Sequence, residues 1–339
     1  ANKEETMKLR LVTITAAVAA IGMATFTGVP AAYSADPDVV TLSGAGPQGR
    51  WFKEASLFGK VLTGALGNKP TVNGVIGKGV SVGNIKRIAA SRVEGGRFYQ
   101  FDIENAHKAQ NQFKGGDYGN VLVWMKLGTH LFRVVADINI KKFSDLKGKK
   151  VAIGVKGSGD DLLAIRILKN YGITTDNTPF QFIGRSDAQN ALANHQLDAV
   201  AMPYARNNRG HLGPVFAARP VGKSTDFAIP DADKNDAFLA SDKTFFLDKL
   251  GEPAFGRPDL VGIAFYQGMA IRADLSDDLV YRMTKALYEN WDQVLKGAPW
   301  WDAPGEASLE SAPAFTTVPY HPGAVRYYKE KGVWAKYHK

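Results

Sequence analysis

Residues Phe143 to Leu162 read FSDLKGKKVAIGVKGSGDDL, which contains a turn, an apolar strand and a glycine-rich loop that opens a helix. The first turn of a helix has backbone N–H groups without a partner, and these groups point at whatever lies in front of it. The positive end of the helix favours a negative charge there. The stretch therefore predicts a strand–loop–helix unit with a candidate anion site at its loop.

The same alternation of strands and helices recurs on both sides and predicts an α/β fold with largely parallel sheets. Polar loops follow the strands, and in open α/β sheets ligands bind beyond the carboxyl ends of strands. Ser276 is the expected N-cap of the helix 277–291, and the stretch from 203 to about 258 has no predicted element. The predicted strands are 39–43, 71–76, 97–101, 129–138, 150–154, 180–183, 197–202 and 261–271, and the predicted helices are 51–66, 82–90, 160–171, 186–193, 277–291 and 322–337.

Length and composition indicate a globular chain of roughly two domains, because 339 residues with 45% apolar content can bury a large core. The net charge of +9 falls only to +8 without residues 1–34, which carry three basic and two acidic residues. The basic residues are dispersed and no aromatic ladder interleaves with them, so a nucleic-acid partner is not expected.

Residues 1–34 are typical of an export signal. Basic Lys8 and Arg10 precede an apolar stretch from Leu11 to about Thr25, and small residues lead to a predicted cleavage after Ser34. Met7 is the expected natural start. The chain has no cysteine, which excludes a lipid-anchored N-terminus and disulfides. We therefore expect a soluble, monomeric protein in a periplasm, since the apolar stretch is shorter than a membrane span requires.

Three tracts carry a family resemblance: DLKGKKVAIGVKGSGD at 145–160, GVSVGNI at 79–85, and the ending DLVYRMTKALYENWDQV with VPYHPGAVRYYKEKGV. In order and spacing they resemble the TAXI-type solute receptors of TRAP transporters across residues 38 to 333. The resemblance implies a type II periplasmic-binding-protein fold, with two Rossmann-like lobes joined by two crossover strands and a ligand between them. We expect lobe one at 37–131 plus 264–339 and lobe two at 132–263.

The loop 156–160 is the first candidate site. Gly157 and Gly159 permit close backbone approach, Ser158 adds a hydroxyl and Lys156 a charge, a combination suited to a carboxylate. Asp160 departs from the family, where threonine is common. Either Asp160 caps the helix while Lys156 and Ser158 hold the anion, or Asp160 receives a ligand ammonium.

Loops of both lobes supply the other candidates, with Tyr204 and Arg206 following the lobe-two strand 197–202. Arg50 could bind a carboxylate with its fork and Trp51 could wall the pocket, or both could be structural. Asp102 and Glu104 follow the third strand where the family commonly has uncharged residues and then aspartate. The remaining candidate contacts are Ser43, Gly44, Phe52, Lys78, Ser81, Asn84, Tyr204 and Arg206, while Trp300 and Trp301 are expected to be packing residues and His321 to begin a helix.

Catalytic alternatives are weaker. Gly44-x-Gly46-x-x-Gly49 matches the fingerprint of NAD(P)-binding oxidoreductases, but no acidic residue between Glu54 and Glu94 is available for the ribose. The histidines lack metal-site spacing, so neither a metal nor a cofactor is expected. The sequence thus predicts a non-enzymatic receptor that delivers a small organic acid or amino acid to a TRAP permease, with a receptor for an ABC importer or a sensor as the alternative.

Overall fold

The computed structural model describes residues 36–47, 49–205, 212–249, 260–301 and 306–339. The predicted export signal and the candidate contact Arg206 lie outside these residues. Within the described part of the chain, we find no helix with the length and apolar character needed to cross a membrane.

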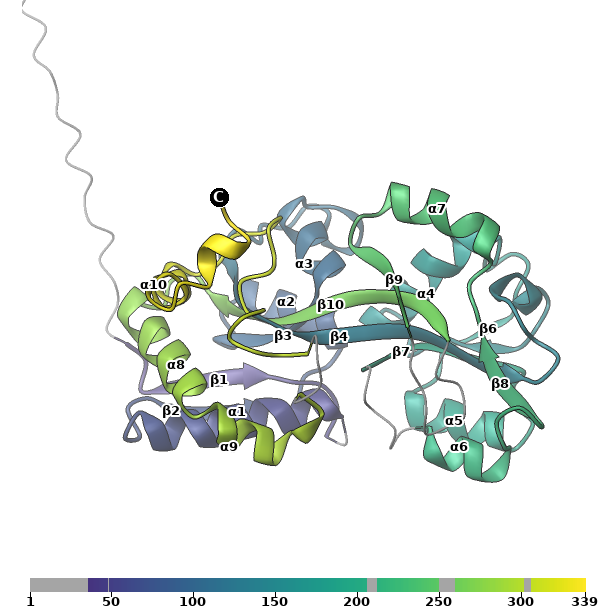
Figure 1. Cartoon of the computed structure of the whole chain (residues 1–339), viewed down its shortest axis with the longest axis horizontal. Helices are drawn as coiled ribbons and strands as arrows, with labels where there is room; N and C mark the ends of the chain where they lie inside the picture. The colour runs from purple at the N-terminus through teal and green to yellow at the C-terminus, as the bar shows by residue number, and fades with distance from the viewer. Residues whose placement is uncertain (1–35, 48, 206–211, 250–259, 302–305) are drawn as a thin grey trace, which may run out of the picture. The chain divides into compact units, whose positions relative to one another are not determined.

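Two long strands organise the fold. β4 (Val121–Asp137) and β10 (Val261–Arg272) pair antiparallel with each other, and each also pairs with two further strands. The end of β10 pairs with β3 and its beginning with β9, whereas the second half of β4 pairs with β7 and β8. They run from one group of βα units to the other (Figure 1), as crossover strands must. The first begins earlier than predicted, at Val121 rather than Thr129.

The sheet follows the order β2-β1-β3-β10-β4-β7-β5-β6, with β8 on β4 and β9 on β10. β1 pairs parallel with β2 and β3, and β5 pairs parallel with β6 and β7. The two crossover strands are antiparallel to their neighbours, so the sheet is mixed rather than largely parallel. This topology places a parallel βα unit on each side of the crossover.

Lobe one is the name used here for β1–β3 and the helices packed around them. α1 packs on β2 and β1 beside α8 and α9, while α2 and α3 pack against β3 and β10. Its core contains the buried Phe58, Trp124 and Tyr328. The elements are β1 (Val39–Ser43), α1 (Arg50–Ala65), β2 (Thr71–Val75), α2 (Val80–Ala89), β3 (Gly95–Tyr99), α3 (Gln100–His107), α8 (Asp277–Glu289), α9 (Trp291–Gly297) and α10 (Pro322–Glu330), with 3-10 turns at Asn111–Phe113, Pro299–Trp301 and Trp334–Lys336.

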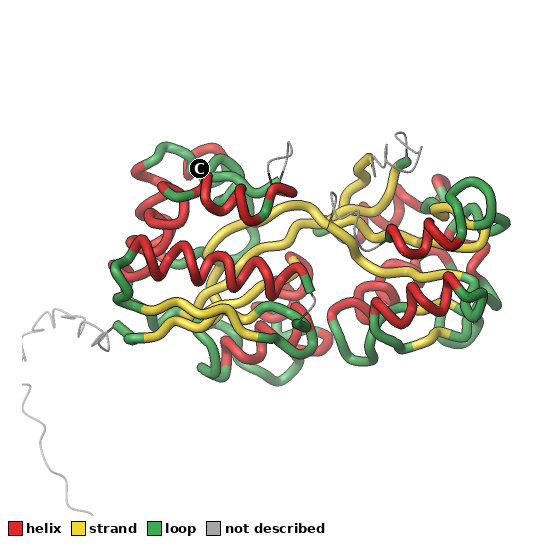
Figure 2. Tube along the Cα trace, turned by 90° about the horizontal axis from the view of Figure 1, so that it is seen from below, coloured by secondary structure: helices red, strands yellow, loops and turns green. Residues whose placement is uncertain are grey.

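Lobe two is the group of elements between the crossover strands. Figure 2 shows its helices around the ends of the crossover strands that lie away from lobe one. The stretch predicted to lack elements contains four short ones, α6 to β9, because segments of four to ten residues carry little periodic signal. The elements are β5 (Val151–Ala152), α4 (Gly159–Leu168), β6 (Phe180–Gln181), α5 (Arg185–Ala193), β7 (Ala199–Ala205), α6 (Gly213–Ala218), β8 (Thr225–Ala228), α7 (Ala232–Ser241) and β9 (Phe245–Lys249), with 3-10 turns at Phe143–Leu146 and Lys169–Tyr171.

Helix ends follow local chemistry as predicted. The Ser276 hydroxyl accepts a hydrogen bond from the backbone N–H of Leu279 at 3.0 Å and caps α8. His321 is buried and its Nδ1 accepts from the backbone N–H of Gly323, so it caps α10. Both predicted helix-start roles are confirmed.

Two glycines of α1 give a matched stability test. A Cβ on Gly59 would lie 2.6 Å from the carbonyl oxygen of Val72 in β2, whereas one on Gly64 would meet nothing within 4 Å. We expect Gly59→Ala to lower the free energy of unfolding by about 1–3 kcal/mol through overpacking. Gly64→Ala should raise it by about 0.5–1 kcal/mol, because alanine loses less backbone entropy in a helix. Thermal melting compares them, and equal effects would contradict the close helix–strand approach.

Candidate functional site

The two lobes meet where α2 and α3 of lobe one face α4 of lobe two. The hydroxyl of Tyr99, at the end of β3, donates to Asp160 Oδ1 in the first turn of α4 at 3.1 Å. Trp51 packs edge-on against Tyr99, with ring centroids 4.9 Å apart. A Cβ on Gly159 would lie only 3.4 Å from that of Ser81, so the helix starts approach closely. Residues from both lobes therefore contact one another around the start of α4.

A buried polar network lies behind Trp51. Arg50 Nε donates to Glu54 Oε1 at 2.7 Å, and Arg97 donates through one nitrogen to Glu54 and through another to Gln267. Trp51 Nε1 donates to Gln267 Oε1 at 3.0 Å. Glu54, Arg97 and Gln267 are fully buried. One carboxylate and one amide oxygen thus serve several donors at once.

The network has more donors than acceptors. Both terminal nitrogens of Arg50, Nε of Arg97 and Nε2 of Gln267 are buried without a hydrogen-bond partner among the described residues. A buried donor left unpaired costs about 1–3 kcal/mol. Because such groups are normally satisfied, an unpaired set of donors at a lobe interface is a feature that needs an explanation. A ligand that supplies acceptors would satisfy it.

The electrostatics of the site favour a negative charge. Burial, aided by Arg50, Arg97, Arg185 and Arg133, holds the pKa of His130 well below its usual range, so this histidine is neutral. Burial also lowers the pKa of Arg50 to about 9, which leaves it protonated at neutral pH.

Several charged side chains near His130 contact one another or influence one another's pKa. Burial is the main cause that lowers the pKa of Arg97, and repulsion from Arg50 adds to it, while Glu306 opposes it. Asp160 pairs with Arg185 at 2.9 Å, and Glu54 contacts both Arg50 and Arg97.

The loop before α4 differs from its prediction. Ser158, not Asp160, is the N-cap: its hydroxyl accepts from the backbone N–H of Asp161, and the Asp161 carboxylate accepts from Gly157 N–H at 2.9 Å. Asp160 is the second helical residue and is held by Arg185 and Tyr99. Lys156 is exposed, with its ammonium 5.6 Å from the centre of the Phe182 ring. A capping role for Asp160 was wrong, because the side chain points across the lobe interface.

The first and second loops are brought together as predicted, but largely through contacts with each other. The Ser43 hydroxyl donates to Asn84 Oδ1 at 2.8 Å, and Asn84 Nδ2 donates to the Gly44 carbonyl at 2.9 Å. Ser81 accepts from the backbone N–H of Tyr99 at 2.8 Å. Lys78 is exposed. These contacts position the start of α1, which carries Arg50 and Trp51 and the half-buried Phe52.

Asp102 and Glu104 were predicted in a loop, but they lie in α3, which begins directly after β3. Asp102 is fully buried, and burial raises its pKa to about 7. Glu104 turns toward the C-terminal segment and accepts from Thr317 Oγ1 at 2.6 Å. Tyr204 is buried in β7, with the Arg185 guanidinium 4.6 Å from its ring centre. Tyr204 therefore supports an arginine of the site.

The sequence prediction missed Glu54, Arg97, His130, Arg185 and Gln267. Trp300 and Trp301 pack in the core of lobe one as predicted, and Trp300 Nε1 also donates to Glu54 at 3.0 Å. Arg185 was detectable, because it follows β6 at the carboxyl end of a parallel strand, where ligands bind. His130 and Gln267 interrupt apolar crossover strands, which is a weaker signal. Among the described residues, no cluster of three or more histidine, aspartate or glutamate side chains is placed to hold a metal ion.

Three solved structures share this architecture. PhnD1 from Prochlorococcus marinus in complex with methylphosphonate is 11% identical, with 89% of this chain and 98% of that chain covered and a TM-score of 0.52. A Xanthomonas citri protein bound to chloride ion is 12% identical, with 88% and 98% covered and a TM-score of 0.51. The same protein bound to ATP is 13% identical, with 89% and 100% covered and a TM-score of 0.50.

At these identities the likeness shows the fold alone, and the fold is the type II periplasmic-binding-protein fold that the motifs implied. The match to a family extends over nearly all of the described chain, from the end of β1 to the end of α10. The family model covers residues 42–332, and the protein therefore belongs to the NMT1-like family.

Proposed function

We propose that this protein is an exported receptor that captures a small organic anion between its lobes and delivers it to a membrane permease. The observation that carries the proposal is Arg50, a protonated guanidinium buried at the lobe interface with both terminal nitrogens unpaired among the described residues. A carboxylate, phosphonate or sulfonate would accept from both nitrogens at once.

The ligand class is narrowed by the kind of groups left unpaired. Arg50, Arg97 and Gln267 all offer N–H donors, and these require acceptors. Asp160, the predicted partner for a ligand ammonium, is already paired with Arg185. An amine-free anion therefore fits the site better than an amino acid. The methylphosphonate and chloride bound by two of the similar structures are in keeping with an anion.

The proposal also concerns the type of permease that receives the solute. The motif resemblance favours delivery to an ion-driven TRAP permease. In this proposal the lobes have their boundaries near residues 131 and 264 and close over the solute. Delivery to an ABC importer is the second candidate, favoured by the phosphonate complex of the similar PhnD1. The neighbouring genes separate them: a large ion-coupled permease supports the first, and a transport ATPase supports the second.

A thermal-shift panel tests the binding function. Glutarate, methylphosphonate and methanesulfonate represent the three anion classes, and glutamate tests the effect of adding an amine to glutarate. We expect at least one anion to raise the melting temperature, and glutarate to exceed glutamate if the carboxylate class is bound. A flat response to all anions, together with native mass spectrometry that finds no co-purified anion, would overturn the proposal.

A further inference from the structure

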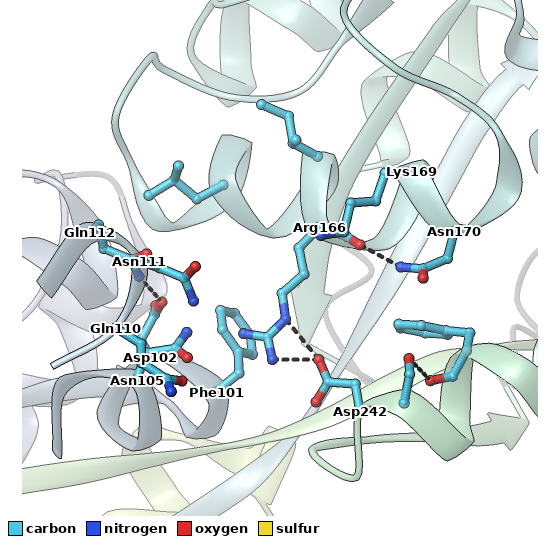
Figure 3. Close-up of a pocket in the computed structure, with 14 residues that line it drawn as sticks. Phe101, Asp102, Asn105, Gln110, Asn111, Gln112, Arg166, Lys169, Asn170 and Asp242 are labelled. Carbon is cyan, nitrogen blue, oxygen red and sulfur yellow. Dashed lines mark hydrogen bonds and ion pairs between the residues drawn. The ribbon is translucent and has the colours of Figure 1, made fainter. Parts of the chain in front are cut away.

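A cavity lies along the lobe interface, on the flank of α4 rather than at its start. It is a groove of about 420 Å³, within the range of about 300–1,000 Å³ typical of small-molecule sites. One wall comes from α3 and the turn after it, and the other from α4, the turn after it and α7. Figure 3 shows these walls facing each other. The groove is separate from the Arg50 network, whose residues do not line it.

The wall from lobe one is rich in carboxamides. Asn105, Gln110, Asn111 and Gln112 line it, and Figure 3 places all four on the same side. Gln112 Nε2 donates to Asp102 Oδ1 at 2.8 Å, and Asp102 is fully buried. The other three side-chain amides make no hydrogen bond among the described residues, although Asn105 is only 7% exposed. Each amide offers both donors and an acceptor.

The groove also contains charged side chains. Arg166 Nε donates to Asp242 Oδ2 at 2.7 Å, and the guanidinium also lies 5.3 Å from the centre of the Phe101 ring. The lining residues include two acids, Asp102 and Asp242, and two bases, Arg166 and Lys169. Arg166 Nη1 and Asp102 Oδ2 are buried without a hydrogen-bond partner among the described residues. The groove therefore offers an unpaired donor and an unpaired acceptor beside its carboxamides.

We propose that this groove binds a small, uncharged, hydroxyl-rich solute, that is, a sugar or a polyol. Hydroxyl groups both donate and accept, so they complement carboxamides without requiring an opposite charge. Asn105 and Gln110 from lobe one contact the solute, and the Arg166–Asp242 pair forms the opposite wall. Because one wall comes from each lobe, the bound solute joins the lobes at a place distinct from the anion site.

Isothermal titration calorimetry on the whole protein tests the proposal, with D-glucose and D-ribose as sugar probes and xylitol and myo-inositol as polyol probes. We expect at least one probe to bind with a dissociation constant in the millimolar range or tighter. Asn105→Leu combined with Gln110→Ala should weaken it at least 10-fold. Asn73→Leu, which alters an exposed amide on β2, is the matched control and should bind as the parent protein does.

Gln110→Ala alone keeps the test valid if the double variant misfolds. Gln110 is exposed, so this single variant should fold, and it should still bind several-fold more weakly. Arg50→Met should leave sugar or polyol binding unchanged, so failure of the anion site and failure of this groove are told apart. The proposal is overturned if no probe binds at 50 mM, or if binding survives the double variant unchanged.

Discussion

Arg50→Met is expected to weaken binding of the cognate anion by at least about 100-fold, because two charge-assisted hydrogen bonds to a desolvated guanidinium are lost. This corresponds to about 2.7 kcal/mol of binding free energy. Glu54 keeps its contacts with Arg97 and Trp300, so the variant should fold. Calorimetry with the anion identified in the thermal-shift panel measures the change.

Two further variants make the Arg50 test specific. Arg50→Lys keeps the charge but not the planar fork, and an intermediate loss is expected. Arg326→Met removes a half-exposed arginine that pairs with Asp278 on α8, outside the network, and should leave affinity unchanged. If Arg50→Met bound the anion as tightly as the parent protein, the unpaired guanidinium would not be the ligand contact.

Asp102→Asn is expected to remove a large pH dependence of stability. The usual pKa of this carboxyl is 3.8, and burial raises it to about 7 in the folded protein. Between these values the folded protein holds a proton that the unfolded chain has lost, so stability falls as pH rises and levels off above pH 7. The pKa difference of about 3 units corresponds to about 4 kcal/mol.

Chemical denaturation at pH 4.5 and pH 8 measures this effect. Relative to the parent protein, Asp102→Asn should gain several kcal/mol in its free energy of unfolding on going from pH 4.5 to pH 8. The amide oxygen can still accept from Gln112, so the local contact is retained. Asp176→Asn, at an exposed loop position, should show no comparable gain. Parallel pH profiles for the parent and Asp102→Asn would mean that Asp102 is hydrated in solution.

The sequence predicted most of the elements that have strong local signals. The strand at Val39–Ser43 and the caps at Ser276 and His321 are where they were expected, because turn and cap chemistry acts over a few residues. The predictions failed where such local signals are absent. α3 starts within one residue of β3, without a loop or a cap to mark the change, so Asp102 and Glu104 were placed wrongly.

Loop 156–160 shows most clearly which features local sequence determines and which features depend on the tertiary structure. Local sequence determined a glycine-rich turn and a helix start, and both are present. Which side chain caps the helix was decided by the arrangement of α4 against lobe one, since Tyr99 and Arg185 draw Asp160 away from the cap and leave that role to Ser158.

The sequence by itself thus determined an α/β chain with two crossover strands and polar loops at the carboxyl ends of its strands. Only the tertiary structure decided the electrostatics of the site. Arg50, Arg97, Arg185 and His130 come from four different elements, and Trp51 and Gln267, which are 216 residues apart, share a hydrogen bond. The cost of burying a charge depends on which partners surround it after folding, and no local pattern records those partners.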